Sequence, residues 1–317
     1  MRGESKALPR TPAPIAVFAY DRPDHLRRCI ESLQANDLAD ESDLFVFSDA
    51  PKEPARSPRV AQVRDYIRTI GRFKTVTIIA QPQNLGLAAS IISGVTKLSS
   101  DFGKVIVVED DLVVSPYFLQ FMNDGLDVYA DDDRVAGIHG YMFPVNHGLP
   151  ETFFLRDPGC WGWATWKRAW EIFEIDGERL RREIRRRGLV NEFNYNGQYD
   201  YSGMLDDQIA GRNSSWAVRW YASVFLQDKL VLHPGASFVR NIGQDGSGTH
   251  DAATGSFHVQ LSPDPISVGG IAVAESPVAR QAMIEFFRSI RKPAIVTFCW
   301  SIALRVRRAI LGRSSKR

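Results

Sequence analysis

Features of secreted and nucleic-acid-binding proteins are largely missing from this sequence. Its three cysteines are widely separated in 317 residues and form neither a disulfide framework nor a CxxC metal site, which favours a reducing compartment. The net charge is only +2, so no general nucleic-acid-binding surface is expected. Residues 1–14 contain no apolar segment of a secretory signal. We therefore expect a cytoplasmic protein that does not bind nucleic acid.

The C-terminal region lacks a hydrophobic run long enough to cross a membrane. Residues 294–304 supply about half of the ~20 apolar residues that a spanning helix requires. They belong to a basic, Trp-containing segment at 293–311, which predicts an amphipathic tail. Such a tail could bind peripherally at the inner face of the membrane or pack on the domain, and both alternatives stay open.

Alternating strand and helix patterns dominate the first part of the chain. We expect strands at 15–19, 44–47, 75–80 and 105–108, with helices between them and Asp24 as the first N-cap. This alternation predicts right-handed crossovers and a mostly parallel sheet in an α/β fold. We expect a flexible leader at 1–13, a domain at 14–262 with halves 14–134 and 135–262, and a helical extension at 263–317.

The segment Val105–Leu112 joins a buried strand to three consecutive carboxylates. Four β-branched apolar residues precede Glu109, Asp110 and Asp111, and unpaired charges so close to a core are costly. A hard divalent cation that carries phosphate oxygens would relieve their repulsion. The alternative is a strand-end turn whose acids are solvated.

Three other predicted strands also end in a polar turn. Asp21, Asp49 and Asn84 follow the first, second and third strands. The carboxyl ends of parallel strands lie at one edge of a sheet, where open α/β sheets bind ligands. These side chains are therefore expected to share a cleft with Glu109–Asp111.

Taken together, these motifs resemble those of the GT-A-fold, Rossmann-like glycosyltransferases of the family 2 type. The chain is also similar to the N-acetylglucosaminyltransferase I-like group. The resemblance covers about residues 14–260 and rests on the order and spacing of its motifs. The motifs are Val17–Pro23, Ser48-Asp49, Asn84–Gly86, Glu109–Asp111, Gly162-Trp163, Asp206-Asp207 and the loop 240–250.

For the donor, the resemblance implies a site for a nucleotide-diphosphate sugar and for Mn²⁺ or Mg²⁺. Asp111 would be the direct metal ligand, and Glu109 and Asp110 would bind ribose or support the site. Asp49 would bind the nucleobase. The remaining donor contacts would come from Asp21, Arg22, Asn84, Gly86 and Arg240.

For the acceptor, the resemblance implies an inverting transfer of the sugar to a glycan or lipid-linked saccharide. It also implies that the fold has an extension on the acceptor side. Asp207 would be the general base, although the pair Asp206-Asp207 could instead cap a helix that begins near Gln208. His250 would contact metal or phosphate. Trp163 would form a wall of the acceptor or donor site, although aromatic clusters more often lie in a core.

Two other functions fit parts of the same pattern. A sugar-1-phosphate nucleotidyltransferase would share the sheet and the cation chemistry, but it needs a glycine-rich basic loop where this chain has Tyr20–Pro23. A glycan-binding domain without turnover would keep the fold and lose the chemistry. The set formed by Glu109–Asp111, Asp207 and His250 argues against that second alternative.

Overall fold

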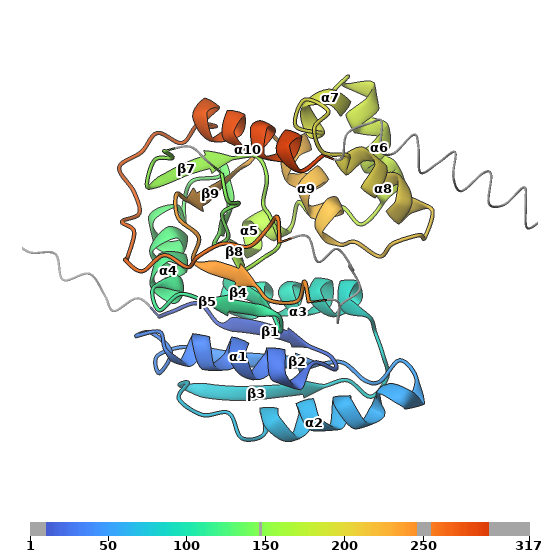
Figure 1. Cartoon of the computed structure of the whole chain (residues 1–317), viewed down its shortest axis with the longest axis vertical. Coiled ribbons are helices and arrows are strands. Elements are labelled where there is room, and N and C mark those ends of the chain that lie inside the picture. Colours follow the sequence, from blue (N-terminus) through green and yellow to red (C-terminus); the bar gives the residue numbers. More distant parts are fainter. Residues whose placement is uncertain (1–10, 146–147, 246–254, 292–317) are drawn as a thin grey trace, which may run out of the picture.

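The computed structural model describes residues 11–145, 148–245 and 255–291, in which the main feature is an eight-stranded mixed sheet (Figure 1). The strand order is β3-β2-β1-β4-β8-β6-β9-β7. These strands are β1 (Ile15–Ala19), β2 (Asp43–Ser48), β3 (Thr75–Ala80), β4 (Lys104–Glu109), β6 (Val135–His139), β7 (Thr152–Leu155), β8 (Trp163–Trp166) and β9 (Leu230–Pro234). A second, two-stranded sheet pairs β5 (Leu112–Val114) with β10 (Val239–Asn241).

The first four strands pair in parallel in the order β3-β2-β1-β4, which confirms the predicted parallel sheet. Their connections are α1 (Pro23–Gln34), the 3₁₀ turn η1 (Pro54–Arg56) with α2 (Ser57–Ile67), and α3 (Leu87–Phe102). Because the strand order reverses after β3, right-handed crossovers place α3 on the face opposite to α1 and α2. Close packing fixes α3 there, since a Cβ on Gly94 would lie 2.7 Å from the Phe18 ring.

The start of α1 differs from the prediction. Asp24 does not cap this helix, because the helix already begins at Pro23 and Arg22 occupies the N-cap position without a capping side-chain hydrogen bond. Proline suits the first turn of a helix, since its missing N–H would have no partner there. The change matters for the site, because it places Arg22 at the junction of β1 and α1.

The second half adds strands to the same sheet and a group of helices at one end of the molecule (Figure 1). β8 pairs antiparallel with both β4 and β6, so strands of both predicted halves share one sheet. A separate apolar cluster lies among the later helices and includes Phe193, Tyr221 and Phe287. The helices of this half are α4 (Phe118–Val128), α5 (Lys167–Trp170), α6 (Gly177–Arg186), α7 (Val190–Phe193), α8 (Tyr201–Ile209), α9 (Ala217–Leu226) and α10 (Pro277–Ile290).

No helix among the described residues is long and apolar enough to span a membrane. The basic tail at 292–317 and residues 1–10 of the predicted leader lie outside the described part of the chain. α10 packs against β7, so the described start of the extension at 263–317 is joined to the sheet.

Two buried histidines connect the strands β6 and β9. His139 Nδ1 lies 3.4 Å from His233 Nδ1, and His233 Nε2 lies 2.8 Å from the Asp157 carbonyl oxygen. Since that carbonyl can only accept, Nε2 of His233 carries the proton and its Nδ1 accepts from His139. Burial lowers the pKa of His233 to about 4, against a partial opposing effect of the bond to Asp157. Both rings are therefore neutral in the folded protein at pH 7.

This pair is expected to make the protein sensitive to acid. The unfolded chain binds a proton at His233 near pH 6.5, whereas the folded chain resists it down to about pH 4. The contribution of His233 to the free energy of unfolding is therefore fully present above pH 6.5 and is lost as the pH falls toward 4. The difference between the two pKa values corresponds to about 3 kcal/mol. Urea unfolding across this range should show a shallower pH dependence for His233→Gln than for the wild type and the exposed control His258→Gln. Equal slopes in all three proteins would contradict the prediction.

Candidate functional site

The acidic turn lies at the carboxyl end of β4, in the middle of the sheet. Glu109 is the last residue of β4, and Asp110 and Asp111 form the turn into β5. The backbone N–H of Asp110 donates to the Phe18 carbonyl at 3.0 Å, and Tyr20 N–H donates to the Asp110 carboxylate at 3.2 Å. The end of β1 therefore holds this turn in place. Of the two aspartates, Asp111 has the more accessible side chain, 14% exposed against 5%.

Arg22 bridges the two aspartates. One guanidinium nitrogen donates to Asp110 Oδ1 at 2.7 Å and to Asp111 Oδ2 at 3.0 Å. Burial opposes the charged guanidinium, but Asp110 and Asp111 outweigh burial and raise the pKa of Arg22. The predicted neighbours Arg22, Asp110 and Asp111 thus form one contiguous charged site.

The acids of the turn are hard to ionise together. Burial, followed by the charges of Asp111 and Asp110, raises the pKa of Glu109 well above its usual range. Burial also raises the pKa of Asp110 to about 6, against the opposing charge of Arg22 and with a further increase from Asp111. A single arginine therefore leaves negative charge uncompensated in this turn. Such a site favours an additional cation.

The segment after β10 closes over Asp111. Ile242 N–H donates to the Asp111 carbonyl at 2.8 Å, and β10 pairs with β5 so that Arg240 lies opposite Val113. A Cβ on Gly243 would overlap the Asp111 carboxylate and lie 2.8 Å from an Arg22 nitrogen. Only glycine therefore fits at 243 without moving the charged site.

Asp49 organises the loop after β3. Its Oδ1 accepts from Ala50 N–H and Leu85 N–H, both at 2.9 Å, and its Oδ2 accepts from Gly86 N–H at 2.9 Å and Asn84 Nδ2 at 3.0 Å. Gly86 precedes α3 with a φ of +76°, which favours glycine. These four bonds fill the acceptor positions of the carboxylate, so a nucleobase would have to displace one. The structure brings Asp49, Asn84 and Gly86 together as predicted, and their contact with a nucleoside stays a prediction.

Asp21 lies at the end of β1 and pairs with a residue that the sequence did not single out. Arg56 of η1 donates to Asp21 Oδ2 at 2.9 Å, and the Asp21 side chain is only 10% exposed. The pair ties the β1 end to the segment before α2. Arg56 itself is half-exposed, which leaves part of its guanidinium accessible.

The predicted base lies on α8, and its local setting differs from the helix-cap alternative. α8 begins at Tyr201 and is capped by Asp200, whose side chain accepts from Gly203 N–H at 2.9 Å. Asp206 and Asp207 therefore lie in its last turn, and Asp206 does not cap a helix that begins near Gln208. Asp207 pairs with Arg212, and no contact in the described part of the chain joins it to Asp111.

The arginine-rich segment 179–187 is a surface helix with acidic partners. Arg181 and Arg185 pair with Asp206 at 3.3 and 3.1 Å, and Arg186 and Arg187 pair with Glu183. These ion pairs neutralise much of the positive charge on α6. The helix therefore offers less charge to an anionic surface than its sequence suggests.

Trp163 does not form a wall of the cleft. It is 2% exposed, and its ring stacks on Trp216 at 5.4 Å between centroids and also packs against Trp220. β8 lies between β4 and β6, and all four of its residues are buried. The Trp163 side chain therefore packs in the core. His250 lies outside the described residues.

Several contributors to the site were not predicted from sequence. His25 on α1 lies 3.2 Å from the Ile242 carbonyl and 3.2 Å from Asp245, and so anchors the segment that covers Asp111. Cys160 lies close enough to Glu109 and Asp111 that their charges, after burial, raise the pKa of its thiol. The glycine-rich composition of 243–248 was a signal for the loop, but no local pattern indicated its contact with Asp111.

A divalent cation would have to share its coordination with a substrate. No group of three or more His, Cys, Asp or Glu side chains gathers at metal-binding distance in residues 11–145, 148–245 and 255–291. Mg²⁺ and similar ions are commonly held by one or two carboxylates together with substrate phosphates. Asp111, with Asp110 beside it, fits that kind of site.

Parts of this chain are similar to known proteins. Residues 15–167, a little under half of the chain, match the glycosyl transferase family 2 model. TarS from S. aureus is similar in structure at a TM-score of 0.33 and 13% identity, over 44% of this chain and 23% of TarS. The mannosyltransferase PcManGT from Pyrobaculum calidifontis gives a TM-score of 0.35 at 12% identity, over 71% of this chain and 73% of that one. Glucosyl-3-phosphoglycerate synthase from Mycobacterium tuberculosis gives a TM-score of 0.31 at 9% identity, over 51% of this chain and 58% of that one.

The chain therefore spans only 23% of the length of TarS, and no curated protein matches it. The similarity to the N-acetylglucosaminyltransferase I-like group stays a prediction. The family match begins at β1 and ends just after β8, and so it includes the strand ends that carry Asp21, Asp49, Asn84 and Asp111. Residues 15–167 are thus similar to family 2 glycosyl transferases, and the sheet to which they contribute has the mostly parallel, Rossmann-like arrangement of a GT-A fold.

Proposed function

We propose that this protein is an inverting, divalent-metal-dependent glycosyltransferase that moves a sugar from a nucleotide-diphosphate sugar to a hydroxyl group. The donor is a UDP-sugar, and the acceptor is a glycan or a lipid-linked saccharide. The observation that carries the proposal is the cluster of Arg22, Asp110 and Asp111 at the carboxyl end of β4. It combines a cation suited to phosphate with an accessible carboxylate suited to a hard metal.

The donor would lie along the strand ends. Asp111 would hold Mn²⁺ or Mg²⁺, and Glu109 and Asp110 would bind ribose or support the turn. Arg22 could pair with the diphosphate, with Arg240 and His250 as further contacts. Asp21, Asp49, Asn84 and Gly86 would contact the nucleoside. The bound metal would neutralise charge that develops on the departing nucleoside diphosphate.

Asp207 would take the proton from the attacking hydroxyl. Asp206 and Asp207 lie in the last turn of α8, where the helix dipole disfavours carboxylates. Asp206 is compensated by two arginines of α6, whereas Asp207 is about half exposed and pairs with Arg212 alone among the described residues. An accessible acid in an unfavourable position supports a functional role.

The test is metal-dependent binding and turnover of nucleotide sugars. The purified chain would be screened by thermal shift against UDP- and GDP-sugars, with Mn²⁺ and with a chelator. Release of free nucleoside diphosphate would be followed in parallel. We expect one UDP-sugar to stabilise the protein only with metal, by about 2.7 kcal/mol at roughly 100 times its Kd. No response to any nucleotide would refute the proposal, and binding without turnover in the presence of acceptors would indicate a glycan-binding domain instead.

Peripheral membrane contact and the domain boundaries at 14–262 and 263–317 are part of the same proposal. The tail that would contact the membrane lies outside the described residues. Binding of the full chain to anionic vesicles, compared with neutral vesicles, would test the contact directly.

A further inference from the structure

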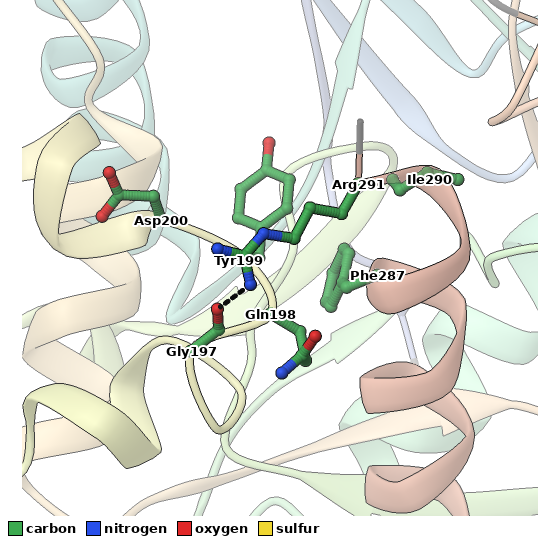
Figure 2. A pocket seen from close by; sticks show the side chains of 7 residues that line it. All are labelled: Gly197, Gln198, Tyr199, Asp200, Phe287, Ile290 and Arg291. Carbon is green, nitrogen blue, oxygen red and sulfur yellow. Dashed lines mark hydrogen bonds between the residues drawn. The ribbon is translucent and has the colours of Figure 1, made fainter. Parts of the chain in front are cut away.

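A pocket with a volume of about 250 Å³ lies between the start of α8 and the end of α10 (Figure 2). It lies outside the family-matched segment and includes none of the residues assigned above to the donor. Its size is slightly below the ~300–1,000 Å³ of most ligand pockets, so it suits a ligand of one or two rings. It is lined by Gly197, Gln198, Tyr199, Asp200, Phe287, Ile290 and Arg291.

The lining offers one aromatic surface and one cationic group. The Tyr199 ring packs at 4.7 Å from the Phe287 ring, and Phe287 itself is buried. Arg291 extends across the pocket and donates to the Gly197 carbonyl at 3.3 Å (Figure 2). A guanidinium has five N–H donors, and the bond to Gly197 is the one side-chain hydrogen bond of Arg291 to a described residue. Its remaining donors therefore have no partner among the described residues and could bind a ligand.

The wall at 195–200 is held in an unusual backbone conformation. Tyr195, Asn196 and Gly197 have φ values of 49°, 56° and 74°, a left-handed run that includes two residues other than glycine. The Tyr195 hydroxyl donates to Asp157 at 3.0 Å, and Tyr199 N–H donates to the Asn194 carbonyl at 3.1 Å. Strained backbone persists where its surroundings fix it, and it is concentrated at ligand sites.

The wall of the pocket is joined to the segment that precedes β8. The Tyr195 hydroxyl donates to Asp157 at 3.0 Å, and the chain runs on from Asp157 to Gly162. A Cβ on Gly162 would lie 2.7 Å from Val239 of β10, the strand that pairs with β5 directly after the acidic turn. The segment 157–162 therefore links the pocket to the acidic turn.

We infer that this pocket binds a sugar residue of the acceptor, with its ring against Tyr199 and its oxygen atoms hydrogen-bonded to Arg291. The inference rests on the proposed function, since it names the acceptor site of that transferase. The flat C–H face of a pyranose packs on an aromatic ring, and hydroxyl or carboxylate oxygens accept from a guanidinium. Both neutral and acidic sugars have a ring face that can pack on Tyr199 and oxygen atoms that can accept from Arg291.

The test uses p-nitrophenyl glucoside and p-nitrophenyl glucuronide, titrated calorimetrically into the full chain with UDP and Mn²⁺. We expect at least one to bind, and Arg291→Ala to weaken it by about tenfold, the effect of one hydrogen bond to a charged group. Arg288→Ala is the matched control, because it removes an exposed arginine of α10 that does not line the pocket. Tyr199→Ala should abolish binding and Tyr199→Phe should retain it, because only the ring is needed for packing.

Thermal shift by UDP and Mn²⁺ on the same proteins separates this inference from the proposed function. A normal UDP shift with no glycoside binding, or with equal binding by Arg291→Ala and Arg288→Ala, would overturn the acceptor pocket and leave the transferase intact. Absence of the UDP shift with Arg291-dependent glycoside binding would refute the transferase and keep the pocket as a saccharide site.

Discussion

Replacing Asp111 with asparagine is expected to lower the rate of sugar transfer by at least about a hundredfold without unfolding the protein. A preorganised electrostatic contact at the reacting centre is typically worth about 10²–10³ in rate, and the proposed metal ligand should contribute at least as much. The fold should survive because Asp110 still pairs with Arg22 at 2.7 Å when the Asp111 charge is lost. Asparagine also keeps the size of the side chain.

The measurement is kcat for transfer and the Mn²⁺ dependence of donor binding, with urea unfolding as the check on folding. Asp101→Asn is the matched control, because Asp101 is an exposed acid on α3 that pairs only with Lys97 among the described residues. Equal activity of Asp111→Asn and Asp101→Asn would show that the acidic turn does not hold the metal. An unfolded Asp111→Asn would instead assign Asp111 a structural role.

Replacing Gly243 with alanine is expected to lower kcat/KM for the donor by about a hundredfold. The added methyl group would overlap the Asp111 carboxylate and crowd Arg22, so either the charged site or the segment after β10 must move. Displacement of catalytic groups by about 1 Å can cost about 10²-fold. Since His25 and the β5–β10 pairing hold the segment from both sides, relaxation away from Asp111 is restricted.

Gly71→Ala provides the comparison, because a Cβ at that position meets nothing within 4 Å. Donor kinetics and nucleotide thermal shift should separate the two variants. Their free energies of unfolding, measured in urea, should stay within about 1 kcal/mol of each other, as for most well-tolerated substitutions. If Gly243→Ala binds the donor as well as Gly71→Ala does, the segment after β10 opens during the reaction and does not position Asp111.

The first half of the fold could be predicted because its signals are local. Val105–Val108 and Thr75–Ala80 are runs of apolar and β-branched residues, and the helices between them have a clear period. The order β8-β6-β9-β7 could not be predicted in this way. β8 pairs antiparallel between β4 and β6, and the choice of those partners depends on packing across distant segments.

Where a side chain had two plausible roles, only the packing of the folded chain decided between them. Trp163 stands in a glycine- and tryptophan-rich segment that suits either a sugar-binding wall or a core, and its contact with Trp216, 53 residues later in the sequence, places it in the core. The sequence also allowed Asp206 to cap a helix, but the residue that caps α8 is Asp200, six positions earlier. Local sequence could not distinguish these alternatives, because each depends on a partner elsewhere in the chain.

The sequence by itself determined that acids and an amide meet at one edge of a parallel sheet, since strand direction and crossover handedness follow from local patterns. The same motifs carry the resemblance of the first half to family 2 glycosyl transferases. Only the tertiary structure decided how the charges of the Glu109–Asp111 turn are shared. Arg22 reaches Asp110 and Asp111 across 88 and 89 residues, and Gly243 closes on them from more than 130 residues away. Electrostatic and steric contacts depend on distance in space. They could not be predicted here because these residues are far apart in the sequence.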